Sequence, residues 1–246
     1  METTKKTKEM DMLNGGLAGK LILFSIPLAF SSILQQLFNS ADVAVVGRFA
    51  GDRALAAVGS CVALVGIFVN LIVGFSVGPN AVLANLIGQK RRDKINRMLH
   101  TIMAFGLIAG VILMGLGMLS AKPILEVSGT PESVMNEALL YIRIYFIGIP
   151  FMMIYNFGSA VLRSFGDTRR PMYYLILSGT VNVILNLILV IYFKLGVAGV
   201  AIATVISNIL SAGLVLIYLY RREDEFQFRP QRLHCLLYTS DAADDR

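Results

Sequence analysis

Six apolar stretches divide most of the chain, and polar or charged residues gather between them. The stretches cover residues 21–46, 56–80, 98–120, 141–162, 172–193 and 197–220. Each reaches about 20 residues, the length at which an α-helix crosses the hydrocarbon core of a bilayer. None alternates polar and apolar positions as a membrane strand does. The pattern therefore predicts an all-α integral membrane protein whose residues 21–220 form a bundle of six transmembrane helices.

Composition and cysteine usage are consistent with this class. Hydrophobic residues make up 56% of the chain and charged residues only 15%, which would expose too much hydrocarbon in water. The lysine-rich start leads into an apolar run that is too long for a removable signal peptide. Two cysteines and two histidines are scattered, with no metal-ligand spacing. We therefore expect no cofactor.

Basic residues are concentrated in alternate connections. Fourteen lysines and arginines lie before the first span, between the second and third, between the fourth and fifth, or after the sixth. The other connections contain five. The positive-inside rule then places both ends of the bundle in the cytoplasm, with residues 1–20 and 221–234 as cytoplasmic segments. The net charge of +6 mainly reflects this topology, so lipid headgroups are a sufficient partner and no nucleic acid is expected.

The connection at residues 121–137 contains the sequence TPES. Thr130 is a suitable helix cap, and Pro131 is suited to the first helical position. We expect a helix to start there and to continue into the fourth span.

Polar residues form a stripe along the first span. Gln35, Asn39 and Asp42 stand at i, i+4 and i+7, on one helical face. A carboxylate at membrane depth costs about 2.5 to 3.5 kcal/mol on insertion scales, so Asp42 should face the bundle interior or a water-filled cavity. The alternative is that Asp42, near the outer end of its helix, reaches headgroup water or Arg48.

Two later spans carry similar stripes. Stripes of this kind, taken singly, are typical of hydrogen bonding between membrane helices. Three stripes around one carboxylate instead predict a hydrated cavity, and an acid kept from bulk water can exchange protons near neutral pH. The additional stripes are Ser178, Asn182 and Asn186 in the fifth span, and Thr204, Ser207, Asn208 and Ser211 in the sixth.

Several motifs resemble a known family. FNSADVAVVGRFAGDRALAAVG, VLANLIGQKRRDK, AVLRSFGDTRRPM and NVILNLILV occur in this order. In order and spacing they closely resemble the amino-terminal lobe of bacterial multidrug and toxic compound extrusion (MATE) transporters, over residues 13–228. Members of that family have two six-helix lobes and export organic cations and other amphiphiles in exchange for protons or sodium.

The resemblance implies roles for individual residues. Asp42 matches the family's first-helix acid, Asn182 and Asn186 the fifth-helix polar pair, and Pro27 a first-helix proline associated with bending. Some members carry aspartate where this chain has Asn186, so one intramembrane carboxylate remains here. A proton needs only Asp42, whereas sodium would also use the carbonyl oxygens of Asn182 and Asn186. The remaining candidates for lining the cavity are Gln35, Asn39, Ser178, Thr204 and Asn208.

Other functional classes fit less well. A lipid-linked oligosaccharide flippase of the same superfamily would line its cavity with basic residues, but here these lie in loops and at helix ends. A membrane-embedded enzyme would need paired Asp-rich or His-Glu-x-x-His motifs, which the sequence lacks. A channel would need a ring of acids rather than one. We therefore expect a cation-coupled antiporter, not an enzyme, in the bacterial cytoplasmic membrane.

The length and the last residues do not match a two-lobe transporter. The 246 residues correspond to one lobe, and residues 221–234 resemble the start of the cytoplasmic linker between lobes. Residues 235–246 are polar and acidic with no apolar span after them. We interpret 235–246 as a non-native tail and the chain as truncated, with a second lobe as the missing partner. The alternative is a half-size protein that acts as a homodimer.

Overall fold

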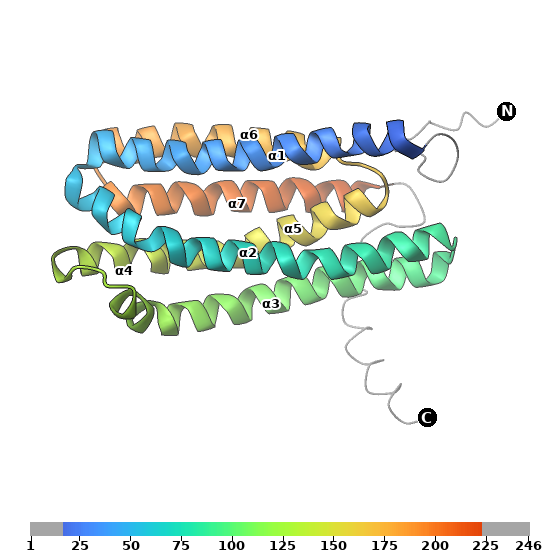
Figure 1. Cartoon of the computed structure of the whole chain (residues 1–246), viewed down its shortest axis with the longest axis horizontal. Helices are drawn as coiled ribbons and strands as arrows, with labels where there is room; N and C mark the ends of the chain where they lie inside the picture. Colours follow the sequence, from blue (N-terminus) through green and yellow to red (C-terminus); the bar gives the residue numbers. More distant parts are fainter. Residues whose placement is uncertain (1–16, 223–246) are drawn as a thin grey trace, which may run out of the picture.

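The structure, a computed structural model, describes residues 17–222, and these residues are helical apart from short turns (Figure 1). Our predictions on residues 1–16, on 223–234 of the linker and on the tail 235–246 lie outside the described residues. The elements are α1 (Leu17–Val45), η1 (Val46–Ala50), α2 (Asp52–Gly88), α3 (Arg92–Val127), α4 (Glu132–Ile147), α5 (Ile149–Ser164), α6 (Arg169–Leu187), η2 (Ile188–Tyr192) and α7 (Gly196–Arg221).

The six predicted spans are all helical. Five helices are long and apolar enough to cross a membrane alone, and α4 with α5 forms a sixth, bent span. At 1.5 Å per residue, the 37 residues of α2 extend about 55 Å, well beyond a hydrocarbon core of about 30 Å. The additional length lies toward the α2–α3 turn, which shares one end of the bundle with the α5–α6 turn (Figure 1). We call this the basic end, because the α2–α3 turn contains Lys90 and Arg91, and the α5–α6 turn is flanked by Arg163 and Arg169.

The fourth span differs from the prediction of one continuous helix. Its two halves, α4 and α5, meet at an angle of 43°. Gly148 separates them, and Pro150 stands in the first turn of α5. Proline has no N–H to donate and glycine is a weak helix former, so the helix bends where the two residues come together.

The predicted start of this span is also corrected. Thr130 does not cap the helix: its hydroxyl is buried and makes no hydrogen bond. Pro131 has φ −59° and ψ 140°, an extended conformation, and is the residue before the helix rather than its first. The helix begins at Glu132, whose carboxylate lies in the first turn, where the helix dipole favours it.

The helices pack around α7, which contacts α4, α5 and α6 (Figure 1). α1 lies along α6 and makes few contacts with α2. Among the side chains of α1 that the structure describes, only Pro27 and Val45 are buried. α1 is therefore the least embedded helix, and α6 mainly determines its position. Large apolar side chains such as Ile22, Leu119 and Tyr192 are exposed on the outer faces, as expected of a bundle surrounded by lipid.

Candidate functional site

Asp42 on α1 accepts hydrogen bonds from two amide side chains of α6. Asn186 of α6 donates a hydrogen bond from Nδ2 to Asp42 Oδ1. With its amide nitrogen turned toward the carboxylate, Asn182 donates to the same oxygen at 2.7 Å, and its own oxygen accepts from the backbone N–H of Thr204 on α7 at 3.3 Å. Two amide donors thus converge on one carboxylate oxygen, an arrangement that stabilises the charged acid.

The cluster lies close to the ends of two helices, at the end of the bundle opposite the basic end. Asp42 precedes the π-helical turn η1 by four residues, and Asn186 precedes the π-helical turn η2 by two. The two turns contact each other and α7. π-helical turns are rare and occur frequently at functional sites, because the extra residue disturbs the regular register.

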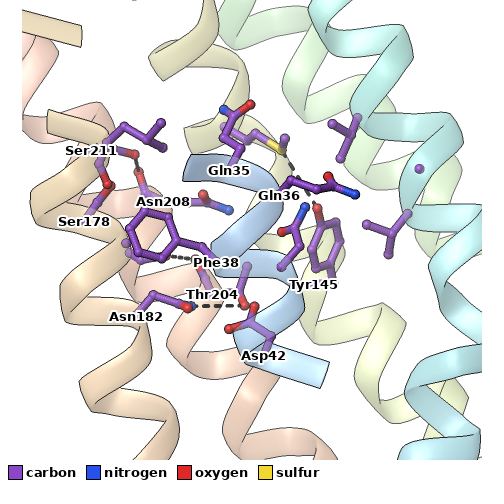
Figure 2. Close-up of a pocket in the computed structure, with 18 of the residues that line it drawn as sticks. Gln35, Gln36, Phe38, Asp42, Tyr145, Ser178, Asn182, Thr204, Asn208 and Ser211 are labelled. Carbon is purple, nitrogen blue, oxygen red and sulfur yellow. Dashed lines mark hydrogen bonds between the residues drawn. The ribbon is translucent and has the colours of Figure 1, made fainter. Parts of the chain in front are cut away.

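A cavity of about 650 Å³ opens beside the carboxylate. Figure 2 shows Gln35, Phe38 and Asp42 of α1 on one side of it, close to Asn182 and Ser178 of α6 and to Thr204, Asn208 and Ser211 of α7. The opposite wall comes from α2, α4 and α5. It contains the polar residues Asn70 and Asn156 beside Val58, Val62, Val65, Val69, Val73, Tyr141, Tyr145, Met152 and Tyr155.

The three polar stripes of the sequence meet at this cavity. Gln35, Asn39 and Asp42 line it together with Ser178 and Asn182, and with Thr204, Ser207, Asn208 and Ser211. Asn186 does not line the open space: it is fully buried behind the wall, where it touches Asp42. The carboxylate of Asp42 is paired with Asn186 and Asn182 rather than with Arg48. Asp42 faces the interior.

Pro27 lies well away from this cluster. It is buried, and α1 remains helical through it. Ser31, one turn later, donates from its hydroxyl to the Pro27 carbonyl at 2.7 Å. Because proline cannot donate a backbone hydrogen bond, α1 has one bond fewer in this turn, which makes it a place where the helix can flex.

The aromatic wall was not identified from the sequence. Tyr141 and Tyr145 stand one turn apart on α4, with ring centroids 6.2 Å apart and planes inclined by 28°. Tyr145 directs its hydroxyl to the sulfur of Met152 at 4.0 Å, and Tyr155 donates to the carbonyl of Pro171 at 3.0 Å. Tyrosines at i and i+4 in an apolar span were the available signal, because a phenol in a membrane needs a polar partner.

The cluster can offer oxygen atoms as well as amide donors. The Asn186 carbonyl oxygen is buried and makes no hydrogen bond. It is an available acceptor for a protonated carboxyl group or an oxygen ligand for a small hard cation. Within residues 17–222, no group of three or more His, Cys, Asp or Glu is placed to hold a metal ion. A transition-metal site of that kind is therefore not present in the described part of the chain.

A protein-family model matches the larger part of the chain. The model described as MatE matches residues 27–188. The chain belongs to the MatE family. It is therefore a multi-pass membrane protein of the MATE transporter fold, as the motifs suggested.

The sequences of individual relatives align with most of the chain. "Probable multidrug resistance protein YoeA" of Bacillus subtilis is 33% identical over 210 residues, which are 84% of this chain and 45% of that protein. "Probable multidrug resistance protein NorM" of Thermotoga maritima is 28% identical over 214 residues, 85% of this chain and 46% of that protein. The chain spans about half the length of the curated relatives it matches.

Solved structures show the same relationship. The crystal structure of a MATE protein in a bent conformation superposes with a TM-score of 0.85 at 25% identity, over 92% of this chain and 51% of that chain. The straight conformation gives a TM-score of 0.83 at 25% identity, over 92% and 51%. The described bundle therefore corresponds to about half of a MATE structure.

Proposed function

We propose that this chain forms the ion-coupling lobe of an antiporter that exports organic cations or other amphiphilic compounds in exchange for H⁺ or Na⁺. One observation carries the proposal: the Asp42 carboxylate, in the wall of the cavity, is held by two amide groups of α6. We place the lobe in the bacterial cytoplasmic membrane, where it would work with a second lobe. The multidrug resistance names of its relatives support export as the activity.

The coupling ion would act on the charge of Asp42. In the charged form, Asn186 and Asn182 both donate to the carboxylate. When a proton or sodium ion arrives, it neutralises the carboxylate. The attraction between the carboxylate and the two amide N–H groups then becomes weaker. The vacant Asn186 carbonyl oxygen can then accept from the carboxyl O–H or bind the sodium ion.

Loss of this attraction would change the position of α1. α1 is mainly supported by α6, and its contact with α2 is slight. With the Asp42 contacts weakened, α1 can move relative to α6 and flex near Pro27, which reshapes the cavity and releases substrate. An ion shifts such an equilibrium only through its different affinity for the two shapes, and the Asp42 cluster supplies that difference.

The cavity fits an amphiphilic cation. Its volume of about 650 Å³ lies within the range of drug-binding pockets. Valine and tyrosine side chains form one wall for rings and hydrocarbon, and Asp42 on the other attracts positive charge. Among the described residues that line the cavity there is no lysine or arginine, so a lipid pyrophosphate would find no basic partner there.

The test measures efflux of ethidium, a planar organic cation, in membrane vesicles that contain the protein as its gene encodes it. In separate experiments, either a proton gradient or a sodium gradient is imposed across the vesicle membrane. Asp42→Asn should insert normally but lose gradient-driven efflux, because a permanently neutral side chain mimics the ion-loaded state. Asp42→Glu should retain part of the efflux. Gln35→Ala should weaken coupling less than Asp42→Asn, since the charge remains.

Asp52→Asn is the matched control, because it also removes one negative charge. Asp52 is exposed at the start of α2 and is not part of the cavity wall. Its variant should export ethidium at the wild-type rate. Normal gradient-driven efflux by Asp42→Asn would show that Asp42 is a structural residue and that the proposed coupling is wrong.

A further inference from the structure

α1 and α6 approach each other closely at one small residue, Gly179. Gly179 is the only glycine in α6 and is buried. An ideal Cβ at Gly179 would lie closer than 3.0 Å to Cε2, Cδ2 and Cζ of the Phe38 ring. Real Cβ atoms essentially never approach other atoms this closely. The ring therefore occupies the space that any other side chain at position 179 would fill, and we call this space the notch.

The notch is placed on the same helical faces as the carboxylate cluster. Phe38 stands one turn before Asp42 on α1, and Gly179 stands three residues before Asn182 on α6. Figure 2 shows the Phe38 ring between the two helices, next to Asn182 and above Asp42. The distance between α1 and α6 at the notch is therefore similar to their distance at the carboxylate cluster.

We propose that Gly179 is a positioning residue: by admitting the Phe38 ring, it sets the distance from Asp42 to the amides of Asn182 and Asn186, and so sets the ion dependence of coupling. This inference rests on the proposed function. It concerns residues that do not touch the ion themselves and act through the helix that carries Asp42.

The geometry gives the size of the effect. Carbon atoms pack at about 3.5 to 4.0 Å, so a methyl group at position 179 would displace the ring by about 1 Å or more, and we expect α1 to move with the ring. The Asn182–Asp42 contact is 2.7 Å. Lengthened by about 1 Å, it would exceed the range in which a hydrogen bond forms. Hydrogen bonds to charged groups contribute enough to change an equilibrium about tenfold or more.

A second close pair in the bundle provides a matched control. At Gly158 on α5, a Cβ would meet Val215 of α7 at a similarly short distance. Neither Gly158 nor Val215 lines the cavity. Gly158→Ala therefore imposes a comparable steric penalty on a helix contact that does not carry Asp42.

The experiment measures ethidium efflux as a function of the concentration of the driving ion. It records the ion concentration that gives half-maximal efflux. Gly179→Ala and Phe38→Ala should each shift that value about tenfold or more, the first by expelling the ring and the second by leaving the notch empty. The double variant should lie closer to wild type than either single variant, because the new methyl group occupies part of the vacated space. Gly158→Ala should lower thermal stability without moving the half-maximal concentration.

The outcomes separate this inference from the proposed function. If Asp42→Asn abolishes coupled efflux but Phe38→Ala and Gly179→Ala leave the half-maximal concentration unchanged, the positioning role is wrong and the coupling role stands. An equal shift in Gly158→Ala would also overturn the inference, since any packing defect would then suffice. Phe38→Ala introduces no clash, so it decides the question even if Gly179→Ala fails to fold.

Discussion

Gly110 on α3 lies against the break between α4 and α5, and replacing it with alanine should destabilise the bundle. An ideal Cβ at Gly110 would lie 2.7 Å from the Cα of Pro150 and 3.2 Å from the Cβ of Met153. Carbon atoms in contact prefer about 3.5 to 4.0 Å. The Pro150 Cα belongs to the main chain and cannot rotate away. Either α3 must move outward or the bend must change, and the bend orients the tyrosine wall of the cavity.

Two opposing effects determine the size of the change. Overpacking a close contact costs about 1 to 3 kcal/mol, whereas replacing glycine by alanine within a helix gains up to about 1 kcal/mol. Gly115 on the same helix has no heavy atom within 4 Å of its ideal Cβ, so Gly115→Ala has only the gain. The two variants should differ by about 2 kcal/mol, or about 4 to 8 °C in unfolding midpoint for a domain of this size.

The assay uses a buried thiol, because the chain contains no tryptophan. Cys61 on α2 is 0% exposed, so a thiol-reactive fluorophore labels it only when the bundle opens. Cys235 is the second of the two cysteines in the chain, and Cys235→Ser makes Cys61 the only reporter. In detergent, Gly115→Ala should unfold at or above the wild-type midpoint and Gly110→Ala clearly below it. A Gly110→Ala midpoint equal to that of Gly115→Ala would refute the close contact between α3 and the break.

Two further predictions concern topology and the α5–α6 junction. Cysteines introduced at the exposed positions Gln89 and Arg169 should react with a membrane-impermeant reagent only from the cytoplasmic side. A cysteine at Glu132 should react only from outside. Labelling of Arg169→Cys from outside would show that the predicted orientation is wrong. Tyr155→Phe should lower stability by about 1 kcal/mol, because the buried Pro171 carbonyl loses the donor now 3.0 Å away, and an unchanged thermal midpoint would show that this hydrogen bond contributes nothing.

The sequence alone determined the class of protein and the position of most of its helices. Apolar runs of about 20 residues have only one common solution in a bilayer, because an isolated helix satisfies all its own backbone hydrogen bonds. It also indicated the polar residues that α1, α6 and α7 contribute around Asp42, although not Asn70 of α2 or Asn156 of α5 in the opposite wall. Gln35, Asn39 and Asp42 share one face by helical periodicity alone, whatever the other helices do.

The tertiary structure decided which of these faces meet. Asn186 and Asp42 are 144 residues apart in the chain, and their hydrogen bond depends on how α1 lies along α6. Near the cluster, the Phe38 ring lies directly against Gly179 of α6, a contact between two helices that no local sequence pattern encodes. The tyrosine wall likewise depends on the 43° bend between α4 and α5. Gly148 and Pro150 permit a bend, but its angle is fixed only by the helices packed against it, since proline and glycine remove constraints on the backbone without specifying its direction.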